Sequence, residues 1–262
     1  NIGGVTGDVD AYQVAFVIPE ILNHIVASGF LSITFIPIFS KYLADDKESE
    51  GWQIFSLIIS VLGIALLILI SIAVWLAPWL VKAFAPGLDD PTQLASAVRM
   101  TRIIIPAQFF FFIGGLLMAV QFAKEQFKIP ALAPLIYNLG IILGGILLSP
   151  VLGMEGFSWG VLAGAFFGNF LIQYWGAQKA GLQFRPVFNL HHPELKKYIF
   201  LTLPLMIGLT MTFSTEFFLK FFGSFFPEGG IASLNYALRV MLILVGLFGQ
   251  AAGVASFPFL SR

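Results

Sequence analysis

The sequence predicts an all-α fold of the polytopic membrane class, a bundle of helices that cross a bilayer several times. Hydrophobic residues make up 58% and charged residues only 11% of the 262 residues, whereas soluble domains carry about 25% charged residues. Mean hydropathy is +0.90. Several apolar runs reach the ~20 residues that a helix needs to cross ~30 Å of hydrocarbon. Together these observations argue against a water-soluble domain.

Seven spans can be drawn between short polar or Gly/Pro-containing links. In order they are residues 11–42, 54–84, 94–123, 129–152, 156–177, 198–222 and 231–260. Pro19, Pro106 and Pro204 lie within three of the spans and predict kinks, which act either as bending points or only as packing features. Small residues that predict close helix contact are Gly144, Gly145, Gly160, Gly164 and Gly168.

Lysine and arginine are unevenly distributed over the links, and cytoplasmic links collect these residues. One alternate set of links contains Lys41, Lys47, Lys124, Lys128, Lys179, Arg185, Lys196, Lys197 and Arg262. On the other side only Lys82 and Lys220 are found, at span ends from which they can snorkel outward. We therefore expect residue 1 outside and Arg262 inside. The long link 179–197 either connects two bundles or lies on the cytoplasmic membrane surface.

The first and last spans share a pattern that predicts an internal repeat. Residues 35–41 read FIPIFSK and residues 256–262 read SFPFLSR, so both contain apolar-Pro-apolar-apolar-Ser-basic. Each span also starts after a glycine, Gly7 in one case and Gly229-Gly230 in the other. Because an even number of spans separates the copies, both cross in the same direction, as in parallel transporter repeats. Chance similarity between two apolar helices is the alternative.

Six ionisable residues remain within spans, namely Glu20, His24, Arg99, Arg102, Glu216 and Arg239. A charge at the bilayer centre costs ~2.5–3.5 kcal/mol on insertion scales, so such residues face a cavity or a partner. Arg99 and Arg102 lie near the outer edge and are expected at headgroups or at a cavity mouth. The others predict an aqueous cavity with a cationic wall, suited to a phosphate or pyrophosphate group. The alternative is mutual neutralisation, of Glu20 by His24 and of Glu216 by Arg239.

The candidate substrate-binding residues combine these charges with two neighbouring amides. They are Arg239, His24, Asn23, Glu20, Asn235 and Glu216. His24 would supply a titratable positive charge, and Glu20 and Glu216 are candidate acids for coupling to an ion. Further polar residues within spans either line the cavity or bridge helices, namely Gln13, Gln108, Gln121, Asn138, Asn169, Gln173 and Gln250.

No catalytic or cofactor-binding constellation is visible in the sequence. The absence of cysteine excludes disulfides, thiolate metal sites and cysteine nucleophiles. His191 and His192 are expected to form a solvated turn, and Asp89 and Asp90 have no basic or hydroxyl partner nearby in sequence. We therefore expect a protein that is not an enzyme and has no metal or cofactor. The net charge of zero argues against nucleic acid as a partner.

Two segments carry a pattern that is specific enough to suggest a family. Residues 7–19 read GDVDAYQVAFVIP, and the pattern continues through residues 27–30 and 35–37. Residues 234–239 read LNYALR. Both segments resemble the MurJ/MviN family of lipid II flippases in the MOP exporter superfamily. The family has Asp-Ala-Phe, Val-Ala-Phe and a proline in the first segment, and Tyr-Ala-Asp-Arg-Leu in the second.

The resemblance implies a MOP-type two-lobe transporter with a central cavity. Such proteins turn lipid II, the undecaprenyl-pyrophosphate-linked peptidoglycan precursor, across the bacterial inner membrane by alternating access. Residues 1–178 would form the N-lobe without its first helix, 179–197 a cytoplasmic interlobe link, and 198–262 the first two spans of the C-lobe. Arg239 matches a family arginine assigned to the pyrophosphate. The implied partners are lipid II, membrane lipids and a coupling ion.

Departures from the family keep other functions open. The family's Arg-Arg pair falls on Asn23 and His24, and its Glu of Ala-Glu-Gly is Ser28. A flippase of another polyprenyl-pyrophosphate-linked glycan is therefore one alternative. A cation-coupled MATE-like exporter is a second, although it favours a net acidic cavity over mixed charges. A membrane enzyme acting on lipid phosphates would need an acid–base cluster at one membrane face, which the links do not show.

Overall fold

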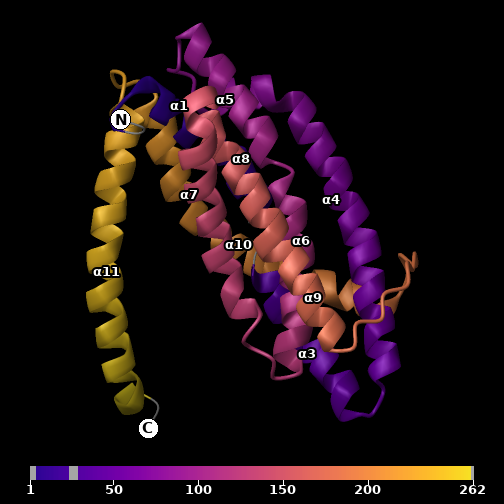
Figure 1. Ribbon diagram of the computed structural model, residues 1–262. Helices are drawn as coiled ribbons and strands as arrows, with labels where there is room; N and C mark the ends of the chain where they lie inside the picture. The colour runs from indigo at the N-terminus through magenta and orange to yellow at the C-terminus, as the bar shows by residue number, and fades with distance from the viewer. Residues whose placement is uncertain (1–3, 24–28, 261–262) are drawn as a thin grey trace.

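The protein is a bundle of helices that are interrupted at several points. The computed structural model describes residues 4–23 and 29–260, and among these no β-strand occurs (Figure 1). The elements are α1 (Gly7–Ala15), α2 (Val17–Leu22), α3 (Gly29–Ala44), α4 (Glu48–Phe84), α5 (Pro91–Ile104), α6 (Ala107–Ala123), the 3₁₀ turn η2 (Pro130–Leu132), α7 (Ala133–Leu152), α8 (Glu155–Gly164), the π-helical η3 (Ala165–Leu171), α9 (Ile172–Lys179), α10 (Pro193–Gly223) and α11 (Gly230–Leu260).

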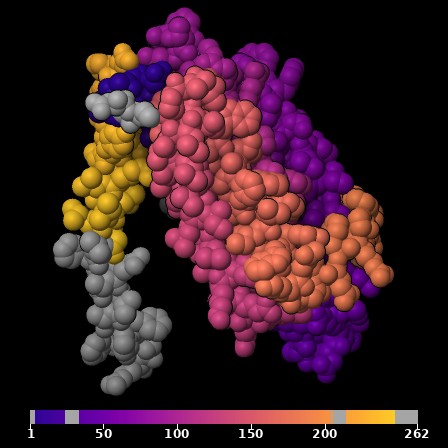
Figure 2. All heavy atoms as spheres, viewed as in Figure 1, coloured from indigo at the N-terminus to yellow at the C-terminus, as the bar shows by residue number. Residues whose placement is uncertain are grey.

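Each predicted span coincides with one helix or with consecutive helices. By length and composition, three stretches of the described residues could cross a membrane: Glu48–Phe84, Pro91–Ala123 and Pro130–Leu152. Helix α7 lies at the surface of the bundle (Figure 2). Its outward face is apolar, with Leu147 67% and Val151 85% exposed. Hydrocarbon, rather than water, is the solvent that suits a face of this kind.

The two sets of links lie at opposite ends of the bundle (Figure 1). The lysine- and arginine-rich links, between α3 and α4, α6 and α7, and α9 and α10, lie at what we call the basic end. The start of the chain and the other links lie at the opposite end. Helix α11 starts beside α1 at that opposite end and runs in the same direction, as the predicted parallel repeat requires. It contacts α1 and α10 and diverges from the bundle toward the basic end (Figure 1).

Prolines interrupt two of the predicted spans. Helix α1 ends at Ala15 because Pro19 has no N–H to donate to the carbonyl of Ala15. The Thr101 hydroxyl of α5, which donates to the carbonyl of Ala97 at 2.7 Å, also lies 3.4 Å from the carbonyl oxygen of Ala15. In the same way α5 ends at Ile104, just before Pro106. Helix α10, in contrast, is continuous through Pro204.

The predicted small-residue rows form a close helix contact between α7 and α8. A Cβ atom on Gly144 would lie 2.5 Å from the Cα atom of Gly160 and 2.7 Å from the carbonyl oxygen of Gly156. A Cβ atom on Gly140 would lie 2.5 Å from the Cα atom of Gly164. Backbone atoms cannot rotate away as a side chain can, so this seam requires glycine on both helices.

Replacing Gly144 with leucine is therefore expected to separate α7 from α8. The overpacking should lower the free energy of unfolding by about 3 kcal/mol, the upper part of the usual range, because the clash is with backbone. Thermal unfolding of the purified protein in detergent measures the effect. Gly246→Leu is the matched control, because no atom lies within 4 Å of the Cβ position there. Equal stability of the two variants would contradict the packing argument.

Candidate substrate cavity

A cavity of about 560 Å³ lies where the proline-interrupted spans meet α7, α8, α10 and α11. It contains five of the six predicted binding residues; the sixth, His24, lies outside the described residues. The lining consists of Tyr12, Gln13, Phe16, Pro19, Glu20, Asn23, Ile104, Gln108, Phe111, Tyr137, Asn138, Ile141, Val161, Glu216, Lys220, Asn235 and Arg239. The sequence thus predicted which polar residues converge, although they lie on helices far apart in the chain.

Arg239 is positioned by a neighbour on its own helix. Its Nε donates to Oδ1 of Asn235 at 3.1 Å, and Asn235, one turn earlier on α11, is 5% exposed. This bond fixes one edge of the planar guanidinium, while Arg239 as a residue is exposed. The terminal nitrogens can therefore offer paired N–H donors, the arrangement that suits a phosphate or carboxylate.

Lys220 is the cavity residue that the sequence placed wrongly. We expected it to snorkel outward, but its side chain is 2% exposed and its Nζ lies 2.8 Å from Oε2 of Glu20. The same Nζ lies 3.6 Å from Oε2 of Glu216, one turn earlier on α10. The end of α10 is covered by the α4–α5 link, where the backbone N–H of Gly87 donates to Oγ of Ser224 at 3.0 Å. The ammonium group therefore has no open path to the outer surface and pairs inward instead.

The ion pairs differ from the mutual neutralisation that was the alternative interpretation of Glu216 and Arg239; His24, the other proposed partner of Glu20, lies outside the described residues. Glu216 pairs with Lys220, not with Arg239, and Glu20 also pairs with Lys220. Among the described lining residues two carboxylates face two cations, so this part of the wall is balanced in charge and is not the cationic wall that we predicted. Of these two cations, Lys220 is buried and Arg239, on α11, belongs to an exposed residue.

One amide of the cavity wall lacks a partner in the described structure. Gln108 follows the break at Pro106 and is 4% exposed, and its Oε1 accepts no hydrogen bond from described groups. A buried acceptor in this state is costly unless a donor reaches it. The oxygen is therefore available to a hydroxyl or amide donor inside the cavity.

At the end opposite the basic end, the starts of α1 and α11 cap each other. The carboxylate of Asp10 accepts hydrogen bonds from the backbone N–H groups of Gly229 at 2.6 Å and Ala232 at 2.7 Å. In return, Oε1 of Glu228 accepts from the N–H of Gly7 at 2.8 Å. Carboxylates at helix N-termini satisfy free backbone donors and favour the helix dipole. This reciprocal cap joins α1 and α11 beyond the cavity.

The sequence pointed to the glycines of this cap but not to its carboxylates. Asp10 is 4% exposed, and its role depends on α11 lying beside it, which a linear reading does not show. The usable signal was an acidic residue within the first turn after Gly7, together with Glu228 directly before Gly229 and Gly230.

Other predicted polar residues hold the bundle together outside the cavity. Arg99 pairs with Glu155 at 2.5 Å, and Nε of Arg102 donates to the carbonyl of Val74 at 3.1 Å. Neither arginine lines the cavity. Gln121 and Gln173 bridge α6 and α9 through an amide–amide hydrogen bond of 3.2 Å. Of the two roles predicted for these residues, lining the cavity or bridging helices, the structure shows the second.

The two aspartates of the α4–α5 link do have partners, contrary to expectation. Asp89 pairs with Lys82 at 3.0 Å, one helical turn or more before it in the chain. Asp90 caps α5 by accepting from the N–H and the hydroxyl of Thr92, both at 2.7 Å. These bonds to the charged form hold the pKa of Asp90 below its usual value. Both residues therefore shape the link.

Comparison with known proteins shows which family this chain belongs to. The family model described as lipid II flippase MurJ matches residues 1–262. The chain belongs to this family. A solved MurJ structure, "Lipid II flippase MurJ, inward closed conformation", superimposes with a TM-score of 0.74 at 24% identity, covering 94% of this chain and 50% of that one. The predicted fold class, an all-α bundle of membrane helices with a transporter fold, is thereby confirmed.

Curated relatives carry the same family name. The lipid II flippase MurJ of Burkholderia cenocepacia is 28% identical over 266 residues, covering 99% of this chain and 51% of the relative. The probable lipid II flippase MurJ of Vibrio cholerae is 27% identical over 278 residues, covering 100% of this chain and 52% of the relative. The chain thus spans about half the length of the MurJ relatives that it matches.

Proposed function

We propose that this chain is part of a lipid II flippase that works by alternating access across the bacterial inner membrane. Its cavity would bind the pyrophosphate of the undecaprenyl-linked precursor while the lipid tail stays in the bilayer. The observation that carries the proposal is Arg239, a guanidinium fixed by Asn235 at the wall of a polar cavity inside a membrane bundle. Family membership supports the substrate class.

In the proposed division into lobes, the cavity lies between the two lobes, so their relative movement would open it to one side of the membrane at a time. Residues 1–178 would be the N-lobe, 179–197 the cytoplasmic link and 198–262 the start of the C-lobe. In this arrangement the reciprocal cap and the Glu20–Lys220 pair both connect the two lobes at the end opposite the basic end. The described contacts therefore correspond to a cavity closed toward the outside, with α11 diverging on the cytoplasmic side.

The remaining binding residues have distinct roles in this scheme. Asn23 and Gln108 would offer polar contacts to the sugar or phosphate groups, and Glu20 and Glu216 would link binding to an ion through their shared partner Lys220. The protein moves its substrate without a chemical change, so it needs no catalytic group.

A flippase of another polyprenyl-pyrophosphate-linked glycan is the second candidate. It is favoured by Asn23, which lies in the cavity where the resemblance led us to expect an arginine. Loss of that cation would alter which headgroup the cavity prefers, because an amide offers hydrogen bonds without net charge.

Complementation tests the proposed function. The full-length parent gene is placed in bacteria depleted of their own lipid II flippase, and rescue of growth is expected. Arg239→Ala should abolish the rescue at equal membrane levels, because the fixed phosphate-binding fork is lost. Arg239→Lys should rescue only in part, since it keeps the charge without the fork.

Arg99→Ala is the matched control, because Arg99 is an arginine near the same end that does not line the cavity. It should rescue as the parent does. If the parent inserts and fails to rescue, lipid II is the wrong substrate and other polyprenyl-linked glycans become the candidates. If Arg239→Ala rescues fully, Arg239 has no role in transport.

A further inference from the structure

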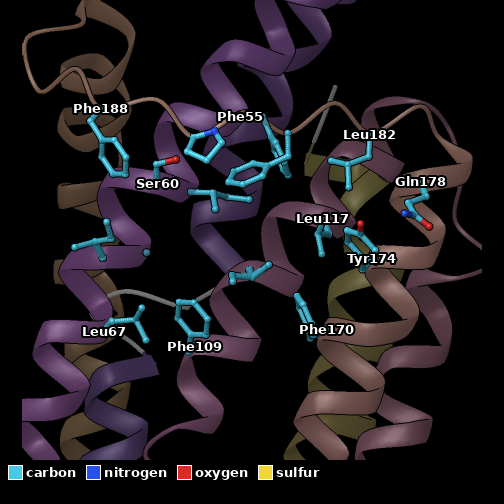
Figure 3. A pocket seen from close by; sticks show the side chains of 16 residues that line it. Phe55, Ser60, Leu67, Phe109, Leu117, Phe170, Tyr174, Gln178, Leu182 and Phe188 are labelled. Atoms are coloured by element: carbon cyan, nitrogen blue, oxygen red, sulfur yellow. The ribbon is translucent and has the colours of Figure 1, made fainter.

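A second, apolar cavity of about 650 Å³ lies between α4, α6, α9 and the segment that follows α9 (Figure 3). It shares no lining residue with the substrate cavity. Aromatic and aliphatic side chains such as Phe55, Phe109 and Leu117 form most of its wall, with Ser60 and Gln178 among the few polar groups. Neither the family relationship nor the proposed transport function requires such a groove.

One wall of this groove is a strap, which we define as residues 182–188. Ser56 and Ser60 lie one turn apart on α4 and hold the strap through its backbone. Oγ of Ser56 accepts from the N–H of Arg185 at 3.1 Å, and Oγ of Ser60 accepts from the N–H of Val187 at 3.3 Å. The strap is thus fixed on α4, with Phe184 and Phe188 among the side chains lining the groove (Figure 3).

The depth of the groove matches one leaflet of a bilayer. On α4 its lining extends from Phe55 to Leu67, a rise of ~18 Å at ~1.5 Å per residue. Half of the ~30 Å hydrocarbon core is ~15 Å. Because the strap follows α9 at the basic end, the groove runs from the membrane surface at that end to about the middle of the bilayer. An acyl chain of that leaflet has this length and direction.

The ionisable residues within the segment that contains the strap are all basic, and the nearby carboxylate of Glu48 is paired with Lys124. Between Gln178 and Pro193 the ionisable residues are Lys179, Arg185, His191 and His192, without a carboxylate. Arg185 is exposed, and Nζ of Lys179 lies 3.6 Å from the ring centroid of Trp175. Basic clusters next to membrane helices attract anionic lipid headgroups.

We propose that this groove binds an anionic phospholipid, with one acyl chain between α4 and α6 and its phosphate beside Arg185 and Lys179. The bound lipid fills the space under the strap and thereby fixes the segment 180–192 against α4. This site is independent of the substrate cavity.

Native mass spectrometry of the full-length protein, titrated with phosphatidylglycerol or with phosphatidylcholine of the same chain length, tests the proposal. Gly63→Phe should reduce phosphatidylglycerol binding at least fivefold, since a Cβ at Gly63 meets only the rings of Phe112 and Phe109 at 3.7 and 3.8 Å and the new ring enters the groove. Leu147→Phe, on the exposed face of α7, is the control for added bulk. Ile64→Trp, also on the groove wall, replaces Gly63→Phe if that variant does not fold.

The headgroup is tested separately. Arg185→Gln should remove most of the preference for phosphatidylglycerol over phosphatidylcholine, whereas Lys128→Gln, a basic residue of another link at the same end, should preserve it. Wild-type binding by both groove variants, or equal binding of the two lipids by the wild-type protein, would overturn the proposal. Displacement of phosphatidylglycerol by undecaprenyl phosphate at equal concentration would also overturn it, because the groove would then belong to the polyprenyl tail.

Discussion

Replacing Lys220 with methionine is expected to lower the free energy of unfolding by about 3 kcal/mol. Removal of one partner from a buried ion pair leaves an uncompensated charge and costs ~3–5 kcal/mol. Here the lower part of that range applies, because the side chains of Glu20 and Glu216 are 30% and 44% exposed. Thermal unfolding in detergent, with the variant and parent protein at the same concentration, measures the difference.

Lys82 provides the matched control. It also lies near the end of its helix opposite the basic end and also pairs with a carboxylate, Asp89, at 3.0 Å, but the two side chains are 46% and 86% exposed. Exposed pairs contribute ~0–1 kcal/mol, so Lys82→Met should change stability little. Adding Glu20→Gln to Lys220→Met should restore part of the loss, because one unpaired charge is removed. A Lys220→Met protein as stable as the Lys82→Met protein would show that the central ion pairs carry no stability.

Replacing Asp10 with alanine is expected to open the end of the cavity opposite the basic end. The change removes two hydrogen bonds from backbone donors to a charged acceptor, each worth ~1.5–3 kcal/mol. The two capped helices should then separate more often. A cysteine introduced at Gln13, a lining residue on α1, reports this opening through its reaction with a membrane-impermeant thiol reagent. We expect at least a tenfold faster reaction, and loss of complementation, in the Asp10→Ala background.

Asp8→Ala is the control for this experiment, because Asp8 lies on the first turn of the same helix and is exposed. Its labelling rate should equal that of the parent. Asp10→Asn retains one acceptor oxygen and should give an intermediate rate. If Asp10→Ala labels no faster than Asp8→Ala, the reciprocal cap does not control access to the cavity.

The parts of this structure that follow from local chemistry were predictable from the sequence. Hydropathy located the helical segments of the described residues, and the lysines and arginines of the links separated the two ends of the bundle. The prolines at positions 19 and 106 interrupt helices as their missing N–H requires. The polar residues most expensive to place in lipid, such as Glu20 and Arg239, converge on one cavity, because lipid offers them no other partner.

What could not be predicted depends on which helices are neighbours. Lys220 lies near the end of its helix, where snorkelling is the ordinary outcome, and only the α4–α5 link packed over that end closes the route to water. Asp10 binds backbone groups of a helix more than two hundred residues away. No periodicity or composition of the chain encodes such a partner.

The cap formed by Asp10 affects how sequence can vary among homologues at this contact. Its partners at positions 229 and 232 contribute backbone N–H groups, which every residue except proline supplies. Substitution of Ala232 leaves the donor in place, so no compensating change at Asp10 is selected there. Gly229 is constrained by its own backbone instead, because its φ is +85° and a Cβ atom there would lie 2.3 Å from Cγ1 of Val5. Pairwise covariation among homologous sequences, which detects contacts through such compensation, should therefore give little signal at this junction between α1 and α11. The junction can stay fixed in geometry while one side of it drifts in sequence.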